Sequence, residues 1–340
     1  MKNINSIFLF LLMTFCNNIF SQSIQVLQSG TKTSIRGLSV VNDKIIWASG
    51  SNGTVIKSID GGNTWQWLIV KDFEKRDFRD IEAFDSNTAI IMAVAEPGLI
   101  LKTKDGGKNW HKVFEDSTKG MFLDAMCFAD EETGMVIGDP INNKPFIAMT
   151  IDQGETWIDP VRGDTSKLPT LFLNEAFFAS SGTNIFIKRN DNNRLIGGFA
   201  SGGMSSRFFT NKENFIIPMI QGKESTGANS VAINNNNEMI IVGGDFANDK
   251  DTAGNCVLSN DFGKTFIKSQ IPPHGYRSCV IYINEKQLVT CGTSGIDISN
   301  DGGLNWKLIS TESFHVVQKA KKGNAVFLAG NNGRIAKLVL

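Results

Sequence analysis

Short segments that place a carboxylate and hydroxyl groups on a glycine-rich turn recur along the sequence, and they are the first candidates for chemistry. The segment 58–65 has the sequence SIDGGNTW, in which the turn lies beside a tryptophan, as it would at the contact point of an active site. Four further octapeptides share the form Ser/Thr-x-Asp-x-Gly-x-Thr/Asn-Trp/Phe. The paired aspartate and aromatic positions are Asp60 and Trp65, Asp105 and Trp110, Asp152 and Trp157, Asp261 and Phe266, and Asp301 and Trp306.

The spacing of these octapeptides indicates architecture. Their aspartates are 45, 47, 109 and 40 residues apart, so the long interval holds two units. A degenerate copy is expected near 206–212, where segment 210–215 has lost the aspartate and the glycine. Within a unit, four apolar or β-branched runs are separated by turn residues, which predicts a four-stranded sheet with the octapeptide as the turn between its third and fourth strands. Units of 40 to 50 residues with four strands each predict a β-propeller.

The two ends of the chain are predicted to close the ring. The last unit has three strand patterns, at 314–319, 325–329 and 334–340, and lacks a fourth. A spare strand pattern, 24–28, precedes the first complete unit. We therefore expect an all-β fold with seven four-stranded antiparallel blades, in which the N-terminal strand completes the last blade and leaves no open edge there.

The five octapeptides are identified as Asp-box, or BNR, repeats, and segments such as 98–110, GLILKTKDGGKNW, resemble the photosystem II stability and assembly factor family of seven-bladed propellers. Asp-boxes also occur in sialidases, other glycosidases and the sortilin ectodomain. The resemblance implies that all five octapeptides are structural and lie on the rim opposite the ligand face. It specifies the fold far better than the function.

A candidate site emerges when the expected first strands of the seven units are aligned. Each start has an apolar or small residue followed by polar residues, and first strands line the central channel of a propeller. We expect these polar side chains to gather at one mouth of the channel. They are Arg36, Arg79, Asp80, Asp124, Glu175, Asn229, Arg277 and His315.

Two long loops, 139–145 and 245–255, are expected to emerge on the same face, and long loops on one rim are typical of a binding surface. Two interpretations of the polar side chains stay open at this point. They either bind a ligand, or they are solvated groups and ion pairs that stabilise the ring, since clustered charges perturb pKa values in both cases.

The most specific enzymatic hypothesis is a glycosidase. Sialidases bind a carboxylate with three arginines and use a tyrosine nucleophile paired with a glutamate, so the resemblance would give Arg36, Arg79 and Arg277 the first role. Tyr276 with Glu175 would supply the second, and Asp80 or Asp124 the acid/base. The Arg-Ile-Pro signature of sialidases is missing, because segment 34–37 has the sequence SIRG. A hydrolase with two carboxylates alone is a further alternative.

Other classes of function have little support. The 34 basic and 34 acidic residues give no net charge, so nothing in the composition favours nucleic acid or an anionic membrane. No dinucleotide or phosphate-loop motif and no metal-binding histidine motif occurs, and we expect no cofactor and no metal. The acidic segment 245–255 lacks the EF-hand spacing for calcium. Cys279 and Cys291 could flank one hairpin, but buried free thiols are the expected state.

Residues 1–22 have the composition of an export signal, with Lys2 followed by a short apolar run that ends near Phe15. The run is too short to span a bilayer. Lipid attachment at Cys16 is the less favoured alternative. We therefore expect an exported, monomeric propeller over 23–340, periplasmic or extracellular, without a transmembrane segment in the mature chain. It would bind a protein or glycan ligand at the channel mouth without catalysis, with a sialidase-like hydrolase as the alternative.

Overall fold

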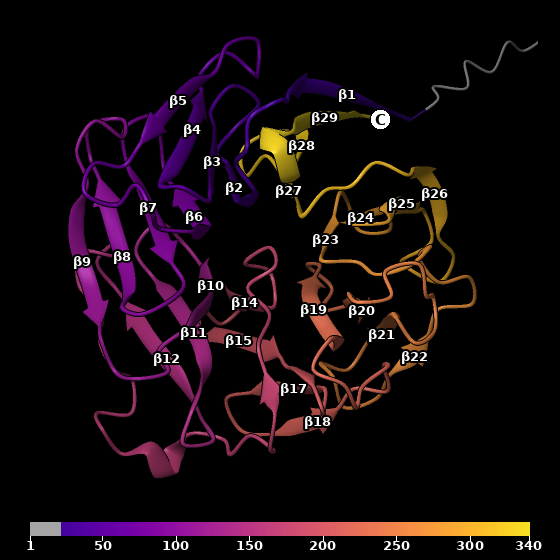
Figure 1. Cartoon of the computed structure of the whole chain (residues 1–340). Helices are drawn as coiled ribbons and strands as arrows, with labels where there is room; N and C mark the ends of the chain where they lie inside the picture. Colours follow the sequence, from indigo (N-terminus) through magenta and orange to yellow (C-terminus); the bar gives the residue numbers. More distant parts are fainter. Residues whose placement is uncertain (1–21) are drawn as a thin grey trace, which may run out of the picture.

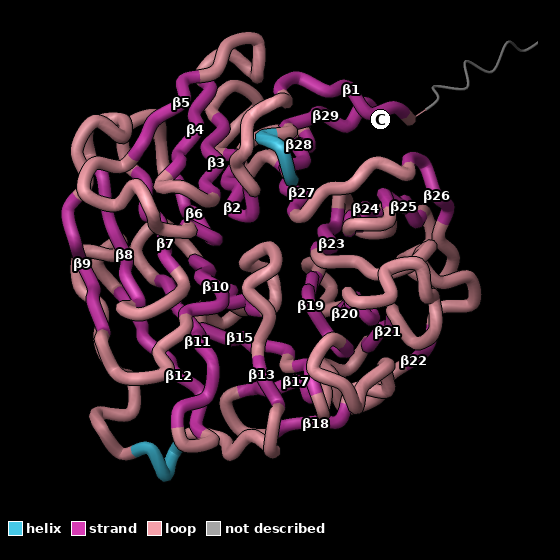
Figure 2. Tube along the Cα trace, viewed as in Figure 1, coloured by secondary structure: helices cyan, strands magenta, loops and turns pink. Residues whose placement is uncertain are grey.

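The computed structural model describes residues 22–340, which form a ring of seven β-sheets around a central channel (Figure 1). Strands and loops make up almost all of the ring, and Figure 2 shows only short helical segments, η1 (Thr165–Lys167) and η2 (Asn331–Gly333). The predicted seven-bladed, all-β propeller is therefore confirmed. No helix among the described residues has the length and apolar character needed to cross a membrane.

The strands of each blade are antiparallel and follow one another from the channel outward. Blade 1 consists of β2 (Ile35–Val40), β3 (Ile46–Gly50), β4 (Thr54–Ser58) and β5 (Gln66–Ile69). Blade 2 consists of β6 (Phe78–Ala83), β7 (Ala89–Ala93), β8 (Gly98–Thr103) and β9 (His111–Asp116). Blade 3 consists of β10 (Leu123–Phe128), β11 (Gly134–Ile141) and β12 (Lys144–Thr150). Blade 3 thus has three strands, which corrects the expectation of four in every blade.

The remaining blades continue this order around the ring. Blade 4 consists of β14 (Ile185–Arg189), β15 (Leu195–Ala200), β17 (Arg207–Thr210) and β18 (Asn214–Ile216), and blade 5 of β19 (Thr226–Ile233), β20 (Met239–Asp245), β21 (Cys256–Ser259) and β22 (Ile267–Lys268). Blade 6 consists of β23 (Cys279–Tyr282), β24 (Leu288–Gly292), β25 (Gly295–Ser299) and β26 (Lys307–Ser310). Blade 7 consists of β27 (Val316–Lys319), β28 (Val326–Ala329), β29 (Ile335–Val339) and β1 (Ser23–Gln28). Two short strands, β13 (Glu175–Ala176) and β16 (Gly202–Gly203), extend the sheet of blade 5 towards blade 4.

The ring closes as the two ends of the sequence predict. Strand β1 pairs antiparallel with β29, with Ser23 opposite Val339 and Val26 opposite Ala336, so it is the outermost strand of blade 7. Figure 1 shows the two strands side by side. This pairing joins the first described strand to the last one and leaves no unpaired edge at the seam.

Apolar side chains pack between neighbouring blades. The middle strands are continuous buried runs, such as Ala89–Ala93 and Gly98–Thr103, because the preceding blade covers one face of each sheet and the following blade covers the other. Six buried apolar clusters lie between the blades, so that a cluster joins every pair of neighbouring blades. The largest cluster joins blades 6, 7 and 1. The outermost strands are more exposed, as in β5 and β22.

All five octapeptides form the same hydrogen-bonded turn between the third and fourth strands. In the first copy, Asp60 Oδ1 accepts from Thr64 N–H at 2.9 Å and Asp60 Oδ2 from Thr64 Oγ1 at 2.6 Å. Ser58 Oγ accepts from Gly62 N–H at 2.9 Å and donates to Asp60 Oδ1. These bonds satisfy the aspartate within the turn and lower its pKa to about 2, chiefly through the bonds from Thr64. The degenerate copy is also a turn, closed by the bond from Thr210 N–H to Glu213 O.

The octapeptide turns lie on the same rim as the turns between first and second strands. Gly61 N–H donates to Lys44 O, and Gly106 N–H donates to Asn87 O. The innermost strands therefore begin at the opposite rim, because strand direction alternates within a blade. This places the octapeptides and the predicted channel mouth at opposite ends of the channel.

Two details of the sequence alignment were wrong. The innermost strand of blade 4 is β14, so Glu175 belongs to β13 and does not begin an innermost strand. The segment 139–145 is not a long loop, because β11 and β12 extend into it and leave a tight turn at Asn142 and Asn143, both in the left-handed region. Asparagine tolerates that conformation better than most residues, which explains the tight turn.

Candidate functional site

Four β-bulges position the polar side chains at the start of the innermost strands. The register shifts between Ile35 and Gly37, between Phe78 and Asp80, between Leu123 and Ala125, and between Ala228 and Ser230. A bulge leaves one residue unpaired and redirects its side chain. The bulged residues are Arg36, Arg79, Asp124 and Asn229, four of the eight predicted site residues.

A short segment before β14, residues 178–184, enters the middle of the ring, and we call it the channel plug (Figure 1). Its Ser180 O accepts from Arg36 Nη1 of blade 1 at 3.3 Å, and its Ser181 Oγ donates to Ser278 O of blade 6 at 2.7 Å. Gly182 lies directly against the Asp80 carboxylate of blade 2, where an added Cβ would be 2.2 Å from Oδ2. The plug therefore separates the predicted mouth from the rest of the channel.

Above the plug, Arg36 and Arg79 lie close enough for their charges to interact. Burial, and then the Arg79 charge, lowers the pKa of Arg36. Arg79 Nε donates to Asp77 Oδ2 at 2.8 Å, and this is the ion pair that Arg79 makes among the described residues. Within residues 22–340, Arg36 has no carboxylate within ion-pair distance, and its guanidinium group donates to Ser180 O instead. Two neighbouring guanidinium groups thus have one ion-paired carboxylate between them, and it is bound to Arg79.

His315 and Asp124 adjoin the two arginines and are incompletely paired. Burial, and then the Arg36 charge, lowers the pKa of His315 to about 4, so its ring is neutral at pH 7. Its Nε2 is buried without a hydrogen-bond partner among residues 22–340. Both carboxylate oxygens of Asp124 and Oδ1 of Asp77 also lack a partner of hydrogen-bond geometry, although the N–H groups of Asp139 and Ala179 lie close enough to lower the pKa of Asp124.

Asp124 is fully buried, and its environment favours the protonated carboxyl group. Burial, and then the Asp139 carboxylate, raises the pKa of Asp124 well above its usual value, while Arg79 acts in the opposite direction. Burial also raises the pKa of Asp139 to about 6, although Phe177 N–H donates to its Oδ1 at 2.9 Å. Two neighbouring acids in one buried place cannot both ionise easily.

The predicted site residues on the other side of the mouth, Asn229 and Arg277, are hydrogen-bonded, although Asn255 Oδ1 and Thr293 Oγ1 of blades 5 and 6 are buried without a partner among the described residues. Asn229 Oδ1 accepts from Tyr276 Oη at 2.8 Å and from Ser180 Oγ of the plug at 3.0 Å. Arg277 is completely buried, and its Nε donates to Asp297 Oδ2 at 2.8 Å. The remaining Arg277 N–H groups donate to Tyr276 O, Ser294 Oγ and His274 O as well as to Asp297.

Glu175 and Asp80 are also held away from the arginine pair. Glu175 forms a buried ion pair with Arg207, at 2.5 Å from Nη2, and accepts from Ser201 Oγ and Phe172 N–H. The Asp80 carboxylate accepts from Met126 N–H and Ile81 N–H on the far side of the plug, and burial raises its pKa well above its usual value. The structure therefore groups Arg36, Arg79, Asp124 and His315, places Asn229 across the mouth from them, and separates Asp80, Glu175 and Arg277.

The side chains that a sialidase mechanism needs are not assembled. Arg277 is directed to Asp297, so Arg36 and Arg79 have no third arginine beside them among the described residues. Tyr276 donates to an amide oxygen, and its pKa is raised to about 12 by burial. Glu175, the proposed partner of Tyr276, is bound to Arg207 instead.

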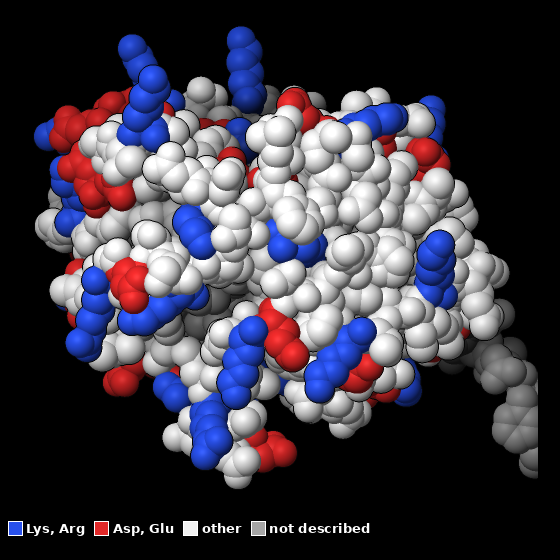
Figure 3. Space-filling view, turned by 90° about the horizontal axis from the view of Figure 1, so that it is seen from below, with Lys and Arg blue, Asp and Glu red and all other residues white. Residues whose placement is uncertain are grey.

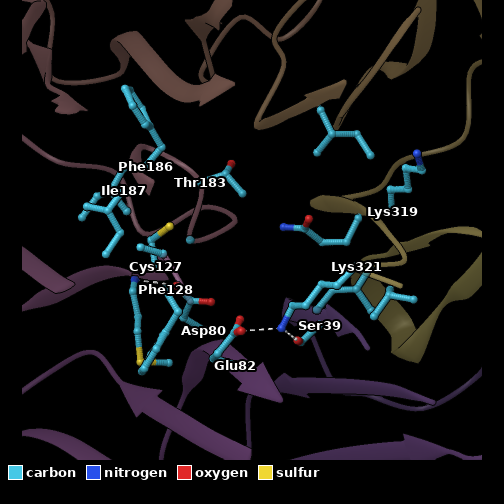
Figure 4. A pocket seen from close by; sticks show the side chains of 18 of the residues that line it. Ser39, Asp80, Glu82, Cys127, Phe128, Thr183, Phe186, Ile187, Lys319 and Lys321 are labelled. Carbon is cyan, nitrogen blue, oxygen red and sulfur yellow. Dashed lines mark hydrogen bonds and ion pairs between the residues drawn. The ribbon is translucent and has the colours of Figure 1, made fainter. Parts of the chain in front are cut away.

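Below the plug lies a cavity of about 630 Å³ that the sequence did not reveal (Figure 4). Its lining includes Ser39, Glu82, Cys127 and Gln318, each three residues after the residue at the channel mouth of its blade. In blades 1, 2 and 3 the bulge adds one residue to the two-residue alternation of the strand, so the next channel-facing position is three residues on. Lys321 donates to Ser39 Oγ at 3.1 Å and pairs with Glu82, as Figure 4 shows.

Metal and disulfide chemistry have no assembled site in the described residues. No group of three or more His, Cys, Asp or Glu side chains gathers there as a metal site would require, and this includes segment 245–255. Cys279 and Cys291 lie directly opposite each other in the register of β23 and β24, and both are free thiols.

Solved structures with the same fold include two that match nearly the full length of this chain. A structure of "YCF48 bound to D1 peptide" is 16% identical, with a TM-score of 0.63, over 93% of this chain and 97% of that one. YCF48 from Cyanidioschyzon merolae is 17% identical, with a TM-score of 0.62, over 93% and 98% of the two chains.

A glycoside hydrolase of family GH74 from Niastella koreensis is 12% identical, with a TM-score of 0.62. The match covers 92% of this chain but 53% of that enzyme. At this level of identity the likeness shows the fold alone. No curated protein matches the sequence.

The family comparison goes further than the structural likeness, because it covers the sequence itself. Residues 16–339 match the family described as photosynthesis system II assembly factor YCF48. The match spans all seven blades, including the strand that closes the ring. The chain therefore belongs to the family of photosynthesis system II assembly factor YCF48.

Proposed function

We propose that this chain is a non-catalytic assembly or stability factor that binds a carboxylate-bearing segment of a partner protein at the channel mouth. Family membership supports the first part, and the D1 peptide bound to YCF48 in one related structure is consistent with a protein partner. The observation that carries the second part is the arginine pair. Arg36 and Arg79 lie together at the mouth with one carboxylate, that of Asp77, within ion-pair distance of either.

The hydrogen-bonding capacity of the pair exceeds what the protein uses. A guanidinium group has five N–H donors, and Arg36 directs one of its groups to Ser180 O while Arg79 uses its Nε for Asp77. Arginine binds a carboxylate through two parallel hydrogen bonds, so an acidic side chain or a C-terminal carboxylate fits this surface. The unpartnered atoms of Asp124 and His315 adjoin the arginine pair but are buried, so a bound segment would pair with them only where its amide groups reach into the mouth.

We also propose that the protein acts outside the cytoplasm, in the periplasm or beyond the cell, and as a monomer. The basis for export is the composition of residues 1–22, which lie outside the described residues except for Gln22. The basis for a monomer is the closed ring, which has no exposed sheet edge at its seam.

A peptide panel would test the binding proposal. Each labelled peptide would be prepared with a free C-terminal carboxylate and as the amide, with and without acidic side chains, and binding would be followed by fluorescence polarisation. We expect the acidic and free-carboxylate forms to bind, and Arg36→Gln and Arg79→Gln each to weaken binding about tenfold or more, because a charge-assisted hydrogen bond is lost.

Lys108→Gln is the matched control, since Lys108 lies in an octapeptide on the opposite rim. Equal binding of free and amidated peptides, or full binding by both arginine variants, would refute the proposed site. Turnover of a sialoside or another glycan by the wild-type protein would replace binding with hydrolysis as its function.

A further inference from the structure

Blade 3 is incomplete, and the missing strand leaves part of its sheet edge open. Ile158 exchanges two backbone hydrogen bonds of 2.8 Å with Met149, in the position of a fourth strand. The next residue of that strand to pair with β12 would be Pro160, which has no N–H, and the chain leaves the sheet there. It returns where Leu171 N–H donates to Asn143 O at 2.9 Å.

Between these two points, β12 has unpaired backbone groups. In an antiparallel sheet, alternate residues direct both their N–H and C=O to the same side. Met149 faces outward to Ile158, so Ile147 also faces outward, and neither its N–H nor its C=O has a partner among the described residues. Pro145 adds an outward carbonyl of the same kind. These groups match the backbone of an added strand.

An apolar groove of about 450 Å³ runs beside this open edge. Its lining includes the apolar side chains of Phe114, Ile141, Phe146, Ile147, Trp157 and Leu168. Segment 161–168, which contains η1, forms its outer wall. The groove therefore offers a place for a large apolar side chain next to backbone groups that would hold an extended chain.

Trp157 differs from the other octapeptide tryptophans in a way that favours this groove. Trp65, Trp110 and Trp306 each donate their indole N–H to a glycine carbonyl of their own turn. Trp157 Nε1 is buried and has no such partner among residues 22–340. Its ring lines the groove instead of sealing its turn with a hydrogen bond.

Charges around the groove restrict the occupant. Figure 3 views the outer side of the ring that holds η1 and β18, and positive and negative side chains are interspersed there without a broad field of one sign. At the start of β12, Lys144 Nζ donates to Leu168 O at 2.9 Å and Thr170 Oγ1 at 2.8 Å. No carboxylate of the described residues lies within ion-pair distance of it. An acidic residue on the occupant would fill that role.

We propose that this edge binds an extended segment of a partner protein, which adds about three residues as an antiparallel fourth strand of blade 3. One large apolar side chain of the segment enters the groove, and an acidic residue lies beside Lys144. The site lies on the outer side of the ring, at the outermost strand of blade 3, and does not depend on the binding proposed at the channel mouth.

The outermost strand of blade 2 supplies a probe with this chemistry. The acetylated, amidated peptide HKVFED has the sequence of β9, which pairs antiparallel with β8. In the same orientation on β12, its two acidic residues come next to Lys144. We expect added peptide to slow amide hydrogen exchange in segment 144–150 of the full chain, and a labelled form to bind in fluorescence polarisation.

Three variants make the binding test decisive. Leu168→Glu should weaken peptide binding about tenfold by placing a charge in the groove. Ile147→Pro should weaken it similarly, because it removes the outward N–H without removing a hydrogen bond inside the sheet. The neutral peptide HKVFQN should bind several-fold more weakly than HKVFED to the wild type, and both should bind equally to Lys144→Gln.

Ile69→Glu is the matched control, because Ile69 is an exposed apolar residue on the outermost strand of a complete blade, and it should leave binding unchanged. Arg36→Gln should leave the slowed exchange in segment 144–150 unchanged, although it weakens any binding of the acidic peptide at the channel mouth, and this separates the two sites. Unaltered exchange in segment 144–150, or full binding by Ile147→Pro and Leu168→Glu, would overturn the proposal. A dimer in sedimentation equilibrium that Ile147→Pro dissociates would assign the edge to a second copy of the chain and also overturn it.

Discussion

The two sides of the channel mouth carry similar side chains in opposite states of pairing. On the side of blades 5 and 6, Arg277 is fully bound to Asp297 and neighbouring oxygen atoms, and Asn229 to Tyr276 and the plug. On the side of blades 7, 1, 2 and 3, Arg79 pairs with Asp77 while Arg36 has no ion pair, and atoms of Asp124 and His315 have no partner among the described residues.

We propose that this difference, more than residue type, separates groups that stabilise the ring from groups that bind a ligand. Buried polar groups in native proteins are nearly always hydrogen-bonded, so a cluster of exceptions needs an explanation. The paired side holds the ring and its plug together. The unpaired side retains capacity for a ligand, as the proposed function requires.

The largest effect on stability is expected from breaking the paired side. Asp297→Ala would leave the Arg277 guanidinium buried without its carboxylate, and the free energy of unfolding should fall by about 3–5 kcal/mol. Urea denaturation followed by tryptophan fluorescence would measure it. Asp77→Ala is the control at the unpaired side, and it should cost about 1 kcal/mol or less, because the Arg79–Asp77 pair is partly exposed. If Asp297→Ala and Asp77→Ala lowered the free energy of unfolding equally, the two sides of the mouth would not differ in their contribution to stability.

A smaller effect, confined to acid, is expected at His315. Its folded-state pKa of about 4 is below the value near 6.5 of an unfolded histidine, so it contributes stability above pH 6.5 that is lost as the pH falls through 4. The stability of the wild type relative to His315→Gln should therefore fall by up to about 3 kcal/mol between pH 7 and pH 4. Urea titrations at half-unit pH intervals would show this. If the difference in unfolding free energy between the two proteins did not change with pH, the His315 imidazole would be solvated.

Asp124 should respond to pH in the opposite direction. Its folded-state pKa is raised, so the stability contributed by its protonated form is fully present below about pH 3.9 and is lost as the pH rises through the folded-state pKa. Asp124→Asn, which mimics the protonated acid, should gain about 1–3 kcal/mol relative to the wild type at neutral pH and little at pH 4. Asp139→Asn should show a similar gain between pH 4 and pH 6. No gain in either variant would place an ion or a charged partner beside these acids.

The repeat of the octapeptides was enough to predict the seven blades, the closure by β1 and the turn chemistry, because each turn is stabilised by its own residues. The alignment of the first strands located Arg36, Arg79, Asp124 and Asn229, since an apolar residue before a bulge recurs in four blades. It failed for Glu175, because the plug inserts a segment between blades 3 and 4 and moves the start of β14 to Ile185. Whether a side chain is paired depends on residues distant in sequence, as in the contact between Ser180 and Arg36 across 144 positions. Sequence position therefore could not separate Arg36 from Arg277.

The smallest effect on stability is expected at Arg36, and it sharpens the comparison most. The guanidinium group contacts one neutral acceptor, Ser180 O, at 3.3 Å and lies near a second positive charge. Arg36→Gln should therefore change the free energy of unfolding by about 1 kcal/mol or less, because a weak hydrogen bond and a like-charge repulsion are removed together. Urea denaturation at low and high salt would measure this, and Arg207→Gln provides the contrast, since Arg207 is buried with Glu175. A loss for Arg36→Gln as large as that for Arg207→Gln would make Arg36 a structural residue, and the unpaired side would then no longer qualify as the binding side.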